Sequence, residues 1–326
     1  MNLHNLDLLK EKRNLLAYSG GTDSNALLQS LLENNIPFDI AIVNYNTRET
    51  SYKEVTLGRS LAKKHGFDIF VLETTELTLE ASKFEASARK IRHDFFKSII
   101  KTNNYDNLIT GHNLDDRLEW AIMQLIKGCG ANELISLTPT YDMLDYTVVR
   151  PLIATSKNEI MAYLKDNDIE YFFDNSNLDD RYHRNYIRSK FSKELMDYFT
   201  PGIRRSFEIM DKESKPISFE YEENNTVVPY FRTAPLEENN FVKVADKLVK
   251  RAGSILSSSQ REELYKNKHI NFYVKDMGEF VVSYFKKRIW LTPFMREVIP
   301  KKDRDRLRRL DVPTKSRPFI HLKTSI

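Results

Sequence analysis

The sequence predicts an α/β protein in which a parallel, doubly wound sheet with a helical extension is followed by a small α+β domain. Three observations indicate this. The 326 residues exceed the length of one typical domain, apolar β-type runs alternate with helix-period segments over the first two hundred residues, and Pro201-Gly202 ends that alternation. Repeated strand and helix units build parallel sheets with helices on both faces. We expect a large domain over residues 1–210 and a small one over residues 211–326.

The elements of the large domain follow in order. Strands are predicted at Asn14–Tyr18, Phe38–Val43, Asp68–Leu72 and Asn107–Thr110. Helices are predicted between them at Asn25–Leu32, Tyr52–His65, Phe84–Ile100 and Leu114–Lys127, and the extension adds Lys157–Asn167 and Asp180–Phe199. Ligands of such sheets bind beyond the carboxyl ends of the strands, so we expect chemistry in the loops after Tyr18, Val43 and Thr110.

The small domain has weaker signals. Lys212–Asn240 contains several prolines and is expected to be an irregular linker. A helix is predicted at Val242–Leu264, and strands at Ile270–Val274 and Glu279–Leu291, with a turn between the strands. From Arg296 to the end, ten Lys/Arg residues outnumber four Asp/Glu residues. This basic tail fits either solubility or polyanion binding, and we expect it to be at most partly ordered.

The composition excludes several classes of protein. With 41% apolar and 29% charged residues, the chain can bury a core and is not expected to be disordered. It has neither a long apolar run nor the apolar block of a signal peptide, so we expect no membrane contact and a cytoplasmic location. The single cysteine, Cys129, cannot form an internal disulfide or a CxxC pair.

A glycine-containing loop directly follows the first predicted strand. It reads Ser19-Gly20-Gly21-Thr22-Asp23-Ser24 and leads into a helix. Two glycines let backbone N–H groups approach an anion, two serines add hydroxyl donors, and the helix N-terminus adds partial positive charge. The loop is neither a Walker loop nor a dinucleotide GxGxxG motif. It predicts a phosphate site, the alternative being a tight turn with Asp23 or Ser24 as helix cap.

A polar helix face follows the fourth predicted strand. His112, Asp115, Asp116 and Glu119 have helical spacing and lie at the sheet end where the phosphate site is expected. Repulsion among three acids would be relieved by a metal ion or a cationic substrate, although a solvated surface is the alternative. The opposite stripe is expected to be buried and comprises Leu114, Leu118, Ala121, Ile122, Leu125 and Ile126.

The Ser19–Ser24 loop resembles that of the ATP pyrophosphatases, which split ATP between its α- and β-phosphates to adenylate a substrate. Further motifs resemble one branch, the tRNA(Ile)-lysidine synthetases: HxxDDxxE at His112–Glu119, a KGxG run from Lys127, and an ExxxRxxR helix with Glu85, Arg89 and Arg92. Downstream matches are Arg150-Pro151-Leu152, Asp174-Asn175-Ser176-Asn177 with Asp179, and Arg184-Asn185-x-x-Arg188. Together these motifs cover roughly residues 19–188.

Some positions depart from the family pattern. Asn44–Arg48 stands where the family has a histidine-bearing stretch, and only Arg48 corresponds to it. Trp120 replaces a threonine, and Lys127 replaces an arginine that could grip a carbonyl or phosphate with two donors. Lys127 is therefore a candidate substrate contact only.

The resemblance implies a ligase that joins free L-lysine to C2 of the wobble cytidine in an isoleucine tRNA with a CAU anticodon, which switches codon reading from AUG to AUA. ATP is held at Ser19, Gly20, Gly21, Thr22, Asp23 and Ser24, with Mg²⁺ near Asp23 and Asp116. His112, Asp115, Asp116 and Glu119 join Asp23 as catalytic residues. The tRNA and substrate contacts are Glu85, Arg89, Arg92, Lys127, Arg184, Asn185 and Arg188, with Arg304–Arg309 as further candidates for phosphate contacts. A homodimer is left open.

Three alternatives are weighed against this interpretation. A tRNA thiolase would need catalytic cysteines, and Cys129 alone does not supply them. A small-molecule amidating synthetase shares the ATP chemistry but does not explain the basic surplus. A catalytically inactive RNA-binding module is disfavoured by the intact ATP loop.

Overall fold

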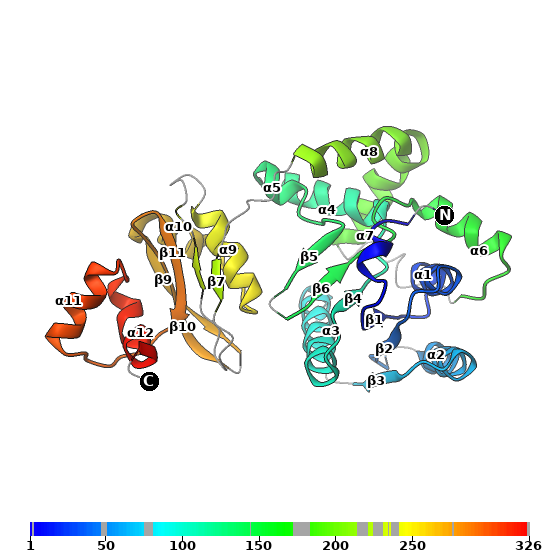
Figure 1. Ribbon diagram of the computed structural model, residues 1–326. Helices are drawn as coiled ribbons and strands as arrows, with labels where there is room; N and C mark the ends of the chain where they lie inside the picture. Colours follow the sequence, from blue (N-terminus) through cyan, green and yellow to red (C-terminus); the bar gives the residue numbers. More distant parts are fainter. Residues whose placement is uncertain are drawn as a thin grey trace. The chain divides into compact units, whose positions relative to one another are not determined.

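The computed structural model describes residues 1, 3–46, 51–74, 81–143, 145–171, 183–213, 221–223, 231–233, 235, 241–275 and 277–324. The chain forms two compact units, residues 1–214 and residues 215–326 (Figure 1). Within the described residues, no helix combines the length and apolar character needed to cross a membrane.

The first unit is built on a six-stranded sheet with the order β3-β2-β1-β4-β6-β5. Its strands are β1 (Asn14–Ala17), β2 (Asp39–Asn44), β3 (Ile69–Glu73), β4 (Asn107–Ile109), β5 (Thr140–Asp142) and β6 (Thr147–Val149). The first four and β6 are parallel, while β5 pairs antiparallel with β6 at the edge. Strand order reverses between β1 and β4, and doubly wound sheets bind their ligands beyond the carboxyl ends of the strands at such a point.

Helices cover both faces of this sheet, as the doubly wound prediction requires. They are α1 (Thr22–Glu33), α2 (Ser51–His65), α3 (Ala81–Asn103), α4 (Leu114–Ile126), α5 (Ala131–Leu134), α6 (Lys157–Asp166), α7 (His183–Ile187) and α8 (Lys193–Glu213). In Figure 1, α1, α2 and α6 lie on one side of the sheet and α3 on the other. Alternation along β1 explains the two cores, because Leu16 packs with α1 and α6 while Leu15 packs with α3.

The helical extension departs from the prediction at Pro201-Gly202, which does not end the helix. Residues 188–192 form a π-helical segment, and α8 then continues through Pro201 to Glu213. The proline costs one backbone hydrogen bond. Met196 and Phe207, on either side of it, are both buried against α4, and this packing outweighs the local cost.

Two further expectations for the first unit were wrong in part. The short hairpin of β5 and β6 was not predicted, because three-residue strands carry almost no periodicity. The apolar stripe of α4 is buried at Leu114 and Ala121, but Leu125 and Ile126 at its end are 66% and 59% exposed. The buried stripe therefore ends before the last turn of α4.

The second unit contains a five-stranded antiparallel sheet with the order β7-β8-β11-β10-β9. Its strands are β7 (Tyr221–Glu223), β8 (Phe231–Thr233), β9 (His269–Val274), β10 (Gly278–Phe285) and β11 (Arg288–Pro293). The expected single strand Glu279–Leu291 is thus a hairpin, turning at Lys286 and Lys287 with φ of 48° and 62°. Lysine rarely adopts this conformation, so the turn had no sequence signal. The expected linker also contributes β7 and β8 to the sheet.

The helices of the second unit are α9 (Phe241–Arg251), α10 (Ser258–Asn267), α11 (Lys301–Arg309) and α12 (Arg317–Thr324). The expected helix Val242–Leu264 is broken after Arg251, at Gly253 with φ of 89°, and Ser257 caps the next helix. The basic tail is ordered, contrary to expectation. Leu307, Val312 and Phe319 bury against Trp290, so sparse apolar positions among the charges fix both terminal helices.

Candidate active site

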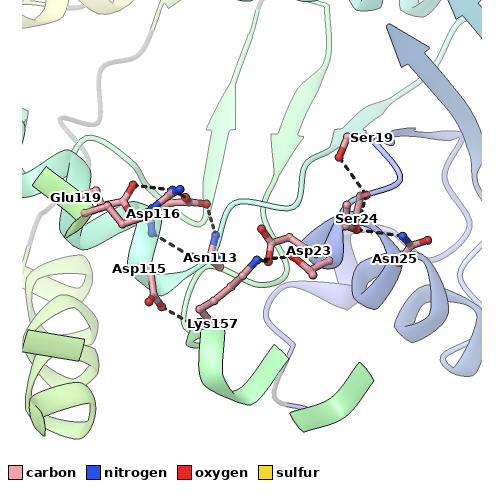
Figure 2. Close-up of polar contacts among 12 residues, drawn as sticks. Ser19, Asp23, Ser24, Asn25, Asn113, Asp115, Asp116, Glu119 and Lys157 are labelled. Carbon is pink, nitrogen blue, oxygen red and sulfur yellow. Dashed lines mark hydrogen bonds and ion pairs between the residues drawn. The ribbon is translucent and has the colours of Figure 1, made fainter. Parts of the chain in front are cut away.

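The Ser19–Ser24 loop lies between β1 and α1, where the backbone prepares an anion site. Gly20 has φ of 72°, and Gly21 is the N-cap of α1 without a side-chain cap. The first N–H groups of α1 therefore remain available to an anion. The alternative prediction, that Asp23 or Ser24 caps this helix, is wrong, because Gly21 is the N-cap. Ser19 Oγ and Ser24 Oγ lie 3.2 Å apart at the mouth of the loop (Figure 2).

The side chain of Asn25 stabilises the conformation of this loop through hydrogen bonds. Its Nδ2 donates to the carbonyl oxygens of Gly20 and Gly21 at 2.6 and 3.1 Å, and its Oδ1 accepts from the Tyr18 hydroxyl at 2.6 Å. A Cβ on Gly20 would meet the Glu54 side chain at 3.0 Å, so both its conformation and its neighbour require glycine. These hydrogen bonds and the packing at Gly20 hold the loop in this conformation.

The carboxylates of α4 lie across from this loop. Asn113 caps α4, and a capping box joins it to Asp116, with both hydrogen bonds at 3.0 Å. Arg184 Nη2 donates to Asp116 Oδ1 at 2.5 Å. Arg184 Nε and Arg188 Nε donate to the two oxygens of Glu119, at 2.8 and 2.6 Å.

Glu119 is only 1% exposed, so this face is not a solvated surface. Two arginines from α7 and the following segment balance the negative charge of Asp116 and Glu119. Burial raises the pKa of Asp116, but the charge of Arg184, the hydrogen bond from the Asn113 backbone and the charge of Arg188 lower it by more, so the net pKa lies below its ordinary value. Asp116 is therefore ionised near neutral pH.

Asp115 has a different environment. Its Oδ2 accepts the backbone N–H of Lys157 at 2.8 Å, and no arginine pairs with it among the described residues. Burial, with the like charges of Asp116 and Glu119, raises the pKa of Asp115 to about 6. Asp115 is the carboxylate of this group that can take up a proton near physiological pH.

His112 precedes α4 and is neutral. Its Nδ1 lies 2.9 Å from Thr110 Oγ1. Burial lowers the pKa of His112 to about 4, helped by the charges of Arg150, Arg184 and Arg92 and opposed by Asp116. An uncharged imidazole can accept or donate a hydrogen bond at neutral pH, but it adds no positive charge to the site.

The other residues predicted to contact substrate or tRNA are only partly near the carboxylates of α4. The guanidinium of Arg89 lies over the Trp120 ring at 5.8 Å from its centroid, and the charge of Arg92 reaches His112. Asn185 lies on α7 between the two arginines. Lys127 is exposed at the opposite end of α4 from the carboxylates. The Glu85 side chain, Arg48, Asp174–Asn177 and Asp179 lie outside the described residues.

Two charged residues escaped the sequence interpretation. Lys157, the first residue of α6, extends its ammonium group to Asp23 at 2.6 Å and also hydrogen-bonds Thr22 (Figure 2). Arg117 is 2% exposed, pairs with Asp211 of α8 and stacks over Phe207 at 4.5 Å. Arg117 joins α4 to α8. The helical pattern could have flagged it, since it stands on the buried side of α4.

Comparison with known proteins identifies the family. A PP-loop domain model matches residues 2–195. A tRNA(Ile)-lysidine synthase of Helicobacter pylori is 36% identical over 97% of this chain and 91% of its own length. Those of Campylobacter jejuni and Wolinella succinogenes are 34% identical, over 97% and 99% of this chain and 94% and 97% of their own lengths. The chain belongs to the tRNA(Ile)-lysidine synthase family.

Membership in the lysidine synthase family confirms the resemblance drawn from the motifs, and with it a ligase that uses ATP. A solved U34-tRNA thiolase from Methanococcus maripaludis has a TM-score of 0.52 at 17% identity, over 64% of this chain and 75% of that chain. This likeness concerns the fold alone. The parallel, doubly wound fold class is confirmed, and neither the thiolase nor the small-molecule alternative is favoured over the lysidine synthases.

Proposed function

We propose that the protein uses MgATP to join free lysine to C2 of the wobble cytidine of an isoleucine tRNA with a CAU anticodon. The observation that carries the proposal is the junction at Lys157. Its side chain contacts the ATP loop while its backbone N–H holds Asp115, so the ATP site and the carboxylate group adjoin. A base held between them could be adenylated and then attacked without leaving the site.

ATP fits the loop because the N-terminus of α1 is uncapped and two hydroxyls flank it. Mg²⁺ bound to ATP favours one or two carboxylates. Asp23 fits this need, because burial raises its pKa and a cation would compensate the ionised form. A magnesium role for Asp116 remains a prediction, since hydrogen bonds from Arg184 and Asn113 already occupy both of its oxygens.

The reaction has two steps. The cytidine O2 attacks the α-phosphate of ATP, forming the O–P bond as the bond to pyrophosphate breaks. The lysine ε-amine then attacks C2, and AMP leaves with the former O2. The amine is protonated near neutral pH and must lose a proton before or during the attack. Asp115 is the proposed acceptor, since arginines engage Asp116 and Glu119.

The RNA contacts are proposals of the same kind. Arg89, Arg92 and Asn185 border the site, and we assign them to the anticodon loop together with Glu85 and Lys127. Arg184 and Arg188 serve Asp116 and Glu119 first, so their contact with RNA would be shared with the carboxylates. A cytoplasmic location is part of the same proposal, because tRNA, ATP and lysine are available there.

Isotope exchange between pyrophosphate and ATP tests this order of steps. With tRNA(Ile) of CAU anticodon and without lysine, we expect exchange, because the first step is reversible and needs only the cytidine. Without tRNA we expect none. Exchange that requires lysine but no tRNA would mean that the lysine carboxylate is adenylated instead, and would overturn the proposal in favour of a small-molecule synthetase.

A further inference from the structure

The ATP loop of this protein has a single charged side chain of its own, and that side chain is negative. Ser19–Ser24 carries Asp23 and no cation. Walker loops include a lysine that reaches the terminal phosphates, and a polyphosphate bound here needs equivalent positive charge beyond its metal ion. The structure supplies a candidate from a distant part of the chain.

Among the described residues, Lys157 is the cation in contact with the loop. Its Nζ lies 2.6 Å from Asp23 Oδ1 and also contacts the Thr22 hydroxyl. Its side chain is 37% exposed, so it is not enclosed by protein and can exchange partners. Arg184 and Arg188 are already held by Glu119, which is 1% exposed.

The position of Lys157 is fixed by the start of α6. Ser156 caps this helix, with a capping box to Glu159, and Arg204 contacts Glu159 and the Ala154 carbonyl. Ile160 and Leu164 of α6 belong to the same buried cluster as Leu27 and Leu31 of α1. The helix that carries the lysine is thus packed on the helix that the loop begins.

We propose that Lys157 is a phosphate-binding residue of the ATP site, taking the part that the loop lysine takes in Walker proteins. In the free protein its ammonium group is held by Asp23 and Thr22. When MgATP enters, the ammonium group moves to oxygens of the β- or γ-phosphate, and the Asp23 carboxylate becomes available to the accompanying cation. The inference rests on the proposed function only in requiring that the loop binds ATP.

Binding measurements without tRNA or lysine test this role apart from activity. Titration calorimetry would measure MgATP, inorganic pyrophosphate and AMP with the full chain and with Lys157→Met, which keeps the methylene stem and the backbone N–H to Asp115. We expect binding of ATP and pyrophosphate to weaken about 10-fold to 100-fold, as for loss of a charged hydrogen bond. AMP binding should be unchanged. Lys165→Met, exposed on the same helix, is the matched control and should bind all three like the wild type.

Each other result has a distinct meaning. Wild-type affinity of Lys157→Met for ATP and pyrophosphate would overturn the inference and leave the proposed function intact. An equal loss for AMP would also overturn it, since the residue would then only shape the loop. No ATP binding by the wild-type chain would contradict the proposed function itself. If Lys157→Met does not fold, Lys157→Gln, which retains a donor to Asp23, decides by the same comparison.

Discussion

Asp115 and Asp116 are neighbours with opposite electrostatic environments. Asp116 is held by a capping box and Arg184, whereas Asp115 accepts a backbone N–H and lies in a half-buried position close to two other acids. The pKa of Asp116 is therefore lowered, and the pKa of Asp115 is raised to about 6. Two carboxyl groups whose environments separate their pKa values are suited to different tasks. We assign proton acceptance to Asp115 and charge balance to Asp116.

The first prediction concerns Asp115→Asn. The variant should still exchange pyrophosphate with ATP when tRNA is present, but lysine transfer should fall by about 10² to 10⁴, the usual share of a general base. In the wild type, transfer measured on preformed adenylated tRNA should rise with pH through about 6 and then level, because the ionised form accepts the proton. Asp166→Asn, exposed on α6, is the control. Equal loss of both steps would refute this assignment.

The same carboxyl group affects stability. Its pKa is higher in the folded than in the unfolded state, so the folded protein binds more protons between pH 3.8 and about 6. The contribution of Asp115 to the free energy of unfolding therefore decreases as pH rises through this window. Asp115→Asn should remove that decrease, which denaturant titrations of both proteins across the window would measure. Parallel curves for the two proteins would contradict the raised pKa.

Glu119 leads to a prediction of stability rather than rate. Glu119→Ala removes a buried partner of Arg184 and Arg188, which keep their contacts with Asp116, so we expect a cost of about 1–3 kcal/mol. The melting temperature of the first unit should fall by roughly 2–12 °C. Glu119→Gln should lose less, since it retains volume and hydrogen bonding. Glu194→Gln, exposed on α8, should change little. A melting temperature like the wild type for Glu119→Ala would contradict the burial of this group.

At the scale of elements, the turn between β10 and β11 is a weak point. Lys286 and Lys287 both have positive φ, which lysine adopts at a cost and Asn-Gly adopts readily. Lys286→Asn with Lys287→Gly should therefore stabilise the second unit by up to about 1 kcal/mol, offset in part by loss of the Lys286–Asp311 ion pair. Thermal unfolding would measure this, with Lys266→Asn on α10 as control. A lower melting temperature would mean that the ion pair outweighs the turn.

The elements also show what sequence can reveal. The Gly-Gly loop and the first four strands were predictable because their signals are local: a run of β-type residues, a break, a helical period. Lys157 was not, because its partner Asp23 is 134 positions away and no local pattern joins the two. The polar face of α4 was predictable as a set of four side chains. Which of these side chains contacts an arginine depends on where α7 packs in the fold. The spacing of residues along the sequence does not predict that position.

At the scale of the whole molecule, charge is concentrated in the terminal helices. Arg304, Arg308 and Arg309 are exposed on α11. The pKa of Arg317 is lowered, chiefly by burial and then by the charges of Arg308 and Arg304. Like charges held close together by a folded scaffold favour an anion beside them. The order of α11 and α12 turns the basic tail into a fixed surface. We expect this surface to contact tRNA phosphates.

A triple variant tests this expectation. Arg304→Gln, Arg308→Gln and Arg309→Gln together should weaken tRNA binding and reduce the slope of log affinity against log salt by roughly 2 to 3, one contact per arginine. ATP binding should not change. The control removes three exposed charges from α2 of the first unit: Lys53→Gln, Lys63→Gln and Lys64→Gln. An unchanged salt slope in the arginine variant would show that the terminal helices do not contact RNA.

The attachment of lysine to a cytidine in tRNA can be measured with the purified protein. Purified protein is incubated with Mg²⁺, ATP, labelled lysine and bulk bacterial tRNA, and the RNA is then digested to nucleosides. We predict label in a lysine–cytidine adduct, and none with Asp23→Ala, whose carboxylate lies in the ATP loop. ATP split to AMP and pyrophosphate with another acceptor, and no labelled nucleoside, would contradict the account.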